Sequence, residues 1–257
     1  MIANYHTHTY RCGHAVGHES RYAEQAAEKG LKILGFSYHT PYDFFDVGPR
    51  NRPMRMMPEE LEEYVASVKA LAKKYEGRLE IHAGLEAEYY PKYFPRLLEM
   101  IRACGVEYLL LGQHFLSNEV DDTHTGRPFC DAARIRQYVS QSIEGLRTGV
   151  FTYFAHPDLV YFQGEDDVYI EEMRKICKAA KETGTPLEIN LLGLRNGRNY
   201  PDERFWRLAG EEGNEVIIGC DAHDPGDVLD PETEKRALAM AEKYSLNLIH
   251  TVKLKKP

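Results

Sequence analysis

The sequence predicts an α/β protein whose parallel strands close into a β/α barrel, and three observations support this fold class. Apolar runs of strand length alternate with amphipathic stretches of helix length along the whole chain, in seven successive pairs. This many β–α repeats favours a barrel over an open sheet. The 257 residues suit one large domain, and no Ser/Gly linker divides them, so we expect a single domain over residues 1–257.

The expected strands are the apolar runs at residues 2–6, 32–38, 79–86, 107–114, 151–155, 186–191 and 215–219. The expected helices lie between and after them, at residues 19–29, 58–75, 92–103, 131–148, 168–183, 202–212 and 231–244. Pro58 and Pro201 are each followed by acidic residues, as is typical of a first helical turn, and Asp131 is placed to cap the next helix. Residues 246–252 fit either an eighth strand or a packed tail.

Charge and cysteine content limit the classes of function. The formal net charge is −8 and there is no Lys/Arg-rich tract, so we expect no nucleic-acid partner. The five cysteines are odd in number and irregularly spaced, which indicates a reducing compartment rather than a disulfide framework. No apolar run approaches membrane-spanning length, and residues 1–20 lack signal-peptide features, so we expect a cytoplasmic protein with no membrane partner.

Two histidines, His6 and His8, stand at the end of the first expected strand. Residues i and i+2 of a strand share a face and lie about 6–7 Å apart, so both imidazoles can reach one cation. The pattern recurs, because six of the seven expected strands end in polar residues of this kind: His6 with His8, His39, Glu86, His114, His156 with Asp158, and Asp221 with His223. In a β/α barrel these strand ends converge on the face where active sites lie.

Nine side chains are therefore candidate metal ligands: His6, His8, His14, His39, Glu86, His114, His156, Asp221 and His223. Imidazole and carboxylate groups suit Zn, Fe and Mn ions. One ion takes about four to six ligands, so we expect two or three divalent metal ions, with Glu86 as a bridging carboxylate. Cys12 and Cys220 are alternative thiolate ligands, although Cys220 should point to the strand face opposite Asp221.

Two expected loops, residues 40–57 and 115–130, are longer than the scaffold needs, and we expect them to shape the site. The first carries three arginines: Arg50, Arg52 and Arg55. Among the remaining histidines, His18 is close enough in sequence to the ligand set to enter a substrate pocket. His124 and His250 are expected at the surface.

The ordered set of residues resembles the PHP (polymerase and histidinol phosphatase) family. The matching motifs span nearly the whole chain: His6-x-His8, His14, His39, Gly84-Leu85-Glu86, His114, His156-Pro157-Asp158 and Asp221-Ala222-His223. Further stretches resemble the monofunctional histidinol-phosphatase branch of that family: residues 10–15, residues 188–195 and Tyr200-Pro201.

The resemblance implies a distorted (β/α)7 TIM-like barrel with a trinuclear metal site. By position, the first metal would be held by His6, His8, Glu86 and Asp221, the second by Glu86, His114 and His156, and the third by His14, His39 and His223. It also implies a metal-dependent phosphatase that hydrolyses a small phosphate monoester. The expected substrate is L-histidinol phosphate, which gives L-histidinol and phosphate in histidine biosynthesis.

On this reading the catalytic residues are Glu86, Asp221 and His223, and the substrate contacts are Arg195, Asn190 and His18. Arg195 follows the sixth expected strand on the catalytic face, and the forked guanidinium matches phosphate oxygens; Arg198 is a second candidate. Three carboxylates remain open as partners for the amine or imidazole of the substrate: Glu88, Asp158 and Glu119.

Three alternatives remain open. A PHP-type phosphoesterase acting on a nucleotide or a phosphodiester would be revealed by a substrate panel. A metal-dependent amidohydrolase also uses His-x-His in a barrel but usually lacks a third metal site, so the number of bound metals distinguishes it. A non-enzymatic metal-binding or docking module would be inactive on every ester.

Overall fold

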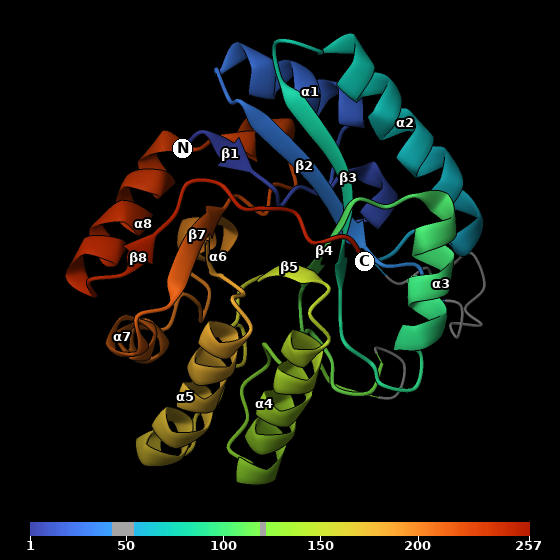
Figure 1. Ribbon diagram of the computed structural model, residues 1–257. Helices are drawn as coiled ribbons and strands as arrows, with labels where there is room; N and C mark the ends of the chain where they lie inside the picture. The colour runs from blue at the N-terminus through green and yellow to red at the C-terminus, as the bar shows by residue number, and fades with distance from the viewer. Residues whose placement is uncertain (43–53, 119–121) are drawn as a thin grey trace.

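The strands form one parallel sheet that curls around on itself (Figure 1). The computed structural model describes residues 1–42, 54–118 and 122–257, and within these ranges eight strands pair in chain order. They are β1 (Ala3–Asn4), β2 (Ile33–His39), β3 (Glu80–Ala87), β4 (Tyr108–Leu111), β5 (Phe151–Phe154), β6 (Leu187–Asn190), β7 (Glu215–Gly219) and β8 (Asn247–Leu248). The predicted TIM-like α/β fold is confirmed, with an eighth strand in addition to the expected seven.

Helices surround the sheet on its outside (Figure 1). The α-helices of the described residues are α1 (Glu19–Glu28), α2 (Leu61–Lys74), α3 (Phe94–Cys104), α4 (Ala132–Arg147), α5 (Asp166–Glu182), α6 (Leu191–Asn196), α7 (Glu203–Glu212) and α8 (Pro231–Lys243). Short 3-10 helices are η1 (Tyr10–Cys12), η3 (Pro58–Glu60) and η4 (Pro225–Val228). Asp131 accepts a hydrogen bond from the Ala133 N–H and caps α4 as predicted. Among the α-helices of the described residues, only α6 lies outside the ranges expected from the sequence, which predicts a strand end and a loop there; the 3-10 helices η1 and η4 are also additional.

Side chains fill the interior of the curled sheet at the end away from the strand termini that carry the histidines. Tyr108 lies at the centre of this core, and its hydroxyl donates to the Tyr5 and Phe36 carbonyl oxygens at 2.7 and 3.0 Å. Gly84 leaves room for the ring, because a Cβ there would lie 2.3 Å from it. Residues beyond β8 pack against the core as a tail: Ile249, Val252 and Leu254. The segment 246–252 is therefore both a short strand and a packed tail.

The first and seventh strands are joined at the opposite end, beyond their named limits. Thr7 and Ala222 form a parallel bridge, in which the His8 N–H donates to the Ala222 carbonyl at 2.8 Å. The Ala222 N–H returns a bond to the His6 carbonyl at 3.2 Å. This bridge brings the end of the first strand beside the end of the seventh, so residues at both termini face one mouth.

All five cysteines are free thiols. Cys220 Sγ points toward the Val228 carbonyl, 3.3 Å away, and so turns from the mouth as expected. Within the described part of the chain, no helix combines the length and the apolar character needed to cross a lipid bilayer.

Candidate metal centre

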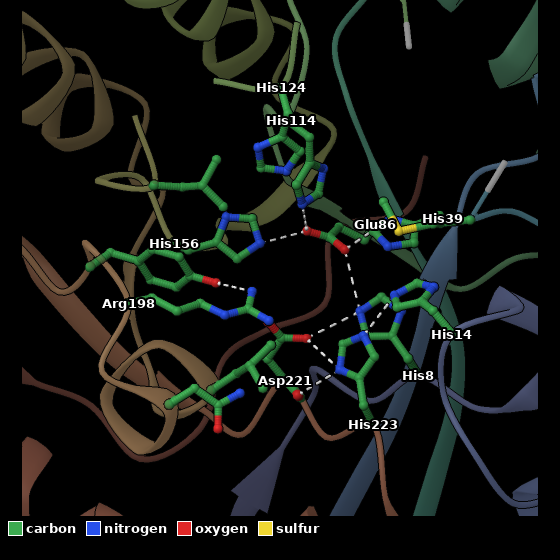
Figure 2. A pocket seen from close by; sticks show the side chains of 15 residues that line it. His8, His14, His39, Glu86, His114, His124, His156, Arg198, Asp221 and His223 are labelled. Atoms are coloured by element: carbon green, nitrogen blue, oxygen red, sulfur yellow. Dashed lines mark hydrogen bonds and ion pairs between the residues drawn. The ribbon is translucent and has the colours of Figure 1, made fainter. Parts of the chain in front are cut away.

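Eight of the nine side chains predicted as metal ligands line a single mouth at the carboxyl ends of the strands (Figure 2). The remaining one, His6, is fully buried and groups with His8 and Glu86. His39 is the last residue of β2 and is in register with Glu86 of β3. His114 and His156 follow β4 and β5, and Asp221 follows β7. Four overlapping groups of ligand atoms each fall within 4.8 Å: His6/His8/Glu86, His6/His156/Asp221, His8/Asp221/His223 and His39/Glu86/His114.

The distances between ligand atoms match those around a small divalent ion. His8 Nε2 lies 3.3 Å from both Glu86 Oε2 and Asp221 Oδ1, and His6 Nε2 lies 3.5 Å from the same two oxygens. Ligands about 2.1 Å from a tetrahedral Zn²⁺ are about 3.4 Å from one another. On the other oxygen of Glu86, His156 Nε2 lies at 2.8 Å and His114 Nε2 at 3.4 Å. Glu86 thus presents one oxygen to each of two ligand groups.

Several of these atoms lack the hydrogen bonds that burial normally requires. His6 Nε2, Glu86 Oε2 and Asp221 Oδ1 are buried and make no hydrogen bond to any described residue. Buried polar atoms are almost always satisfied, and an unsatisfied carboxylate oxygen in a closed site is costly. A cation placed among these atoms would satisfy all three at once.

His14 and His223 meet in a way that also calls for a cation. The Nδ1 of His14 lies 2.8 Å from the Cys12 carbonyl and that of His223 lies 3.0 Å from the Asp221 carbonyl, so both Nδ1 atoms carry hydrogen. Burial lowers the pKa of His14 and lowers that of His223 to about 3, which keeps both rings neutral. The two Nε2 lone pairs therefore face each other at 2.9 Å, an unfavourable contact unless a positive charge lies beside it.

Both carboxyl groups are held in the ionised form. Burial alone would raise the pKa of Glu86, but the surrounding imidazoles, His114 first, hold it well below its usual range. His6 and His8 do the same for the pKa of Asp221. Burial drives the pKa of His39 well below its ordinary value. Ionised carboxylates and neutral imidazoles are the protonation states that metal binding requires.

His6 shows that negative charge is in excess at the centre of the mouth. Burial lowers its pKa, yet the carboxylates of Glu188, Asp221 and Glu86 together hold that pKa well above the ordinary value. This point of the site attracts a positive charge, either a proton or a metal ion.

A second layer of side chains orients the imidazoles from behind. Glu188 Oε1 lies 2.8 Å from His6 Nδ1, and Glu88 Oε1 lies 2.8 Å from His114 Nδ1. Arg55 in turn lies 2.8 Å from the other oxygen of Glu88. His8 Nδ1 lies 3.2 Å from Cys12 Sγ, which places this thiol behind the histidine rather than inside the mouth. Such outer contacts fix which ring nitrogen faces a metal.

The mouth opens into a cavity of about 410 Å³. Besides eight of the nine predicted ligands, its lining includes Met54, His124, Leu159, Leu192, Asn196, Arg198 and Tyr200. His124, expected at the surface, instead lines the cavity with its ring centroid 5.6 Å from that of His114. That expectation was wrong because the backbone N–H of Thr125 binds the His114 carbonyl at 2.8 Å, which brings the neighbouring His124 to the mouth. His250 is exposed, as predicted.

The expectation for Arg195 is corrected by the structure. Arg195 lies in the last turn of α6 and pairs with Asp227 and Asp230, at 3.0 and 3.4 Å, outside the cavity. The unforeseen helix α6 turns this side chain toward η4 and α8. Gly197 then ends α6 in a left-handed conformation, and Arg198 enters the cavity beside Tyr200 (Figure 2).

Neither of the other two predicted substrate contacts lines the cavity. Asn190 is buried and its amide binds Glu188 and Asp221. The His18 side chain is 53% exposed and pairs with Glu19. The structure therefore gives neither side chain a place in the cavity wall.

Two of the three carboxylates proposed as partners of the substrate amine lie outside the cavity, and the third lies outside the described residues. Glu88 is buried behind His114. Asp158 accepts hydrogen bonds from Trp206 Nε1 and the Asp202 N–H. Glu119 lies outside the described residues, as do Arg50 and Arg52.

Glu188 was not singled out as part of the site. The signal for it was present, because a charged residue stands within the apolar run of β6, two positions before Asn190 and thus on the same face.

Comparison with known proteins places this geometry in a family. The model of the PHP domain family matches residues 4–191. A Deinococcus radiodurans protein named "Probable histidinol-phosphatase" is 30% identical over 249 residues, which cover 88% of this chain and 88% of that protein. The Bacillus subtilis histidinol-phosphatase is 27% identical over 252 residues, covering 87% of this chain and 94% of its own length.

Among solved structures, the Lactococcus lactis histidinol phosphate phosphatase complexed with Zn, L-histidinol and phosphate has a TM-score of 0.75 to this chain. The match covers 99% of this chain and 98% of that one, at 16% sequence identity. At this identity the likeness is one of fold.

Gly112 provides a test of the site geometry. A Cβ at this position would lie 2.1 Å from Glu86 Oε1, so Gly112→Ala should displace the shared carboxylate. We expect the variant to bind Zn²⁺ on the order of 10-fold more weakly by competition titration. Gly145→Ala in α4 is the control, because its nearest neighbour is 3.0 Å away and remote from the ligands. Unchanged Zn²⁺ affinity in Gly112→Ala would contradict the position given to Glu86.

Proposed function

This chain belongs to the PHP domain family, and we propose that it is a metal-dependent phosphatase that hydrolyses L-histidinol phosphate to L-histidinol and phosphate. The observation that carries the proposal is the convergence of nine imidazole and carboxylate side chains on one mouth, with buried ligand atoms that only a cation would satisfy. The names of the relatives support this choice of substrate.

The donor set fits two or three divalent ions of the Zn, Fe or Mn type. We assign His6, His8, Glu86 and Asp221 to the first, Glu86, His114 and His156 to the second, and His14, His39 and His223 to the third. Eight of these nine residues occur in the compact groups of ligand atoms, and the contact between His14 and His223 supports including the ninth. A third site of this kind favours a PHP enzyme over an amidohydrolase.

Divalent ions held in this mouth would activate water at neutral pH and neutralise charge on a phosphate group. In the hydrolysis, a water oxygen bonds to phosphorus, the bond from phosphorus to the ester oxygen breaks, and the alcohol leaves with a proton. Glu86 and Asp221 contribute by remaining ionised, and His223 contributes as a neutral ligand at the rim. We propose these three as catalytic residues.

Arg198 replaces Arg195 as the proposed phosphate contact. It lines the cavity, and its Nη1 donates to the Tyr200 hydroxyl at 3.0 Å, which fixes the guanidinium over the mouth. A guanidinium fork binds two oxygens of a phosphate at once. The walls formed by His124, Leu159 and Tyr200 are apolar or aromatic and suit the imidazole end of the substrate.

A substrate panel tests the proposed function. The Zn-, Fe- and Mn-loaded enzyme would be assayed with L-histidinol phosphate, a generic aryl phosphate monoester, a nucleoside monophosphate and a phosphodiester. We expect kcat/KM for L-histidinol phosphate to exceed that for the generic monoester on the order of 100-fold, since the alcohol portion also binds. Similar turnover of all monoesters would reject the specific substrate, and preference for the nucleotide or diester would select the alternative phosphoesterase.

Two arginines three residues apart give a matched test of the phosphate contact. Arg198→Met removes charge-assisted hydrogen bonds of about 1.5–3 kcal/mol, so the KM for the phosphate ester should rise roughly 10- to 100-fold while bound metal is unchanged. Arg195→Met removes the same charge outside the cavity and should leave KM near its wild-type value. Steady-state kinetics with metal analysis decide; a larger effect from Arg195 would restore the sequence-based assignment.

A further inference from the structure

We propose that Glu188 and Asn190 of β6 act as a positioning pair for the metal centre, contacting its ligands without being ligands themselves. The inference rests on the metal binding proposed above. β6 is the one expected strand whose end supplies no predicted ligand, yet its two polar side chains reach three of them. The three are His6, His156 and Asp221.

Glu188 is fully buried and accepts hydrogen bonds from three directions. Its Oε1 lies 2.8 Å from His6 Nδ1, and its Oε2 accepts from the His156 backbone N–H at 3.1 Å and from Asn190 Nδ2 at 3.0 Å. A carboxylate oxygen is a hydrogen-bond acceptor, so this contact turns Nδ1 of His6 toward Glu188. Nε2 of His6 then faces Glu86 and Asp221, as a metal ligand must.

Asn190 continues the same network toward the seventh strand. Its Nδ2 donates to Asp221 Oδ2 at 3.1 Å, and its Oδ1 accepts from the Gly193 N–H at 3.0 Å, which caps α6. Holding Oδ2 leaves Oδ1 of Asp221 directed at His6 and His8. The same amide therefore orients a ligand and anchors the helix that leads to Arg198.

The two ligands that flank β6 have an unusual backbone. His156 has φ 33° and Asp221 has φ 46°, in the left-handed region that residues with a Cβ rarely adopt. Such conformations persist only where surrounding contacts hold them. The His156 N–H is bound by Glu188 and the Asp221 carboxylate by Asn190, so the pair holds both residues in place.

Gly219 gives independent support, because the sequence keeps space for the Glu188 carboxylate. Gly219 is paired with Asn190 in the sheet, and a Cβ there would lie 1.8 Å from Glu188 Oε1. Its φ is not positive, so the backbone does not require glycine at this position. The space beside the carboxylate is the remaining reason for the missing side chain.

Isosteric variants with buried controls test the pair. In Glu188→Gln an amide NH2 group replaces one of the two carboxylate oxygens. A single oxygen then remains to accept hydrogen bonds from His6, the His156 N–H and Asn190. In Asn190→Asp the donor is lost and a carboxylate faces Glu188 and Asp221. The controls are Glu172→Gln and Asn214→Asp, which change buried residues of the same types away from the mouth.

Zn²⁺ affinity and stoichiometry would be measured by competition titration, with unfolding temperatures of the metal-free and Zn-loaded forms. We expect both β6 variants to lose about 10- to 100-fold in Zn²⁺ affinity and much of the rise in unfolding temperature on loading. The controls should lose neither. Gly219→Ala, which displaces the carboxylate without changing it, should reproduce the loss if Glu188→Gln does not fold.

Wild-type affinity and stoichiometry in the β6 variants would overturn the positioning role and leave the proposed function intact. A wild-type protein that binds no Zn²⁺ would overturn both. Equal losses in the β6 variants and in the buried controls would also overturn the inference, because they would report general destabilisation.

Discussion

Two buried carboxylates surrounded by seven imidazoles are the constraint on which this structure depends. Removing Glu86 and Asp221 from water is expensive unless positive charge compensates them, and neutral imidazoles alone do not supply it. The imidazoles hold the pKa of both carboxyl groups well below the usual range, and the carboxylates hold the pKa of His6 well above its usual value. Both directions show that the carboxylates attract positive charge. Bound cations would resolve this imbalance of charge, and the proposed chemistry would then follow from those ions.

The barrel architecture makes this concentration of ligands attainable. Six of the strands contribute one or two side chains at or just beyond their carboxyl ends, so no single segment has to fold around a metal. The bridge between Thr7 and Ala222 joins the ends of the first and seventh strands, and Gly112 and Gly219 leave space for the two glutamates. The packed tyrosines and the tail at the other end keep these strand ends in fixed register.

Much of the fold could be predicted because its signals are local. Apolar runs and helix caps such as Asp131 identified the seven main strands and most helices within a few residues. The candidate ligands were found because the same strand-end pattern recurred six times along the chain. His39 and Glu86 lie at the ends of regular strands, where sequence position nearly determines side-chain direction, and most other ligands follow a strand within a few residues.

The substrate side of the site could not be predicted, because it is built from irregular backbone. The short helix α6 directs Arg195 away from the cavity, and the turn that follows it directs Arg198 into the cavity. The three-residue spacing of the two arginines does not reveal this difference. His124 reaches the cavity only through the fold of a long loop. Glu188 and Asn190 contact the predicted metal ligands from behind, and these contacts depend on three strands that are distant in sequence.

The most direct test of the central claim is an anomalous-scattering map of crystals of the metal-loaded protein. The account predicts two or three cations in one mouth, with Glu86 contributing an oxygen to each of two of them. A single cation, or cations bound while Glu86 points elsewhere, would contradict it.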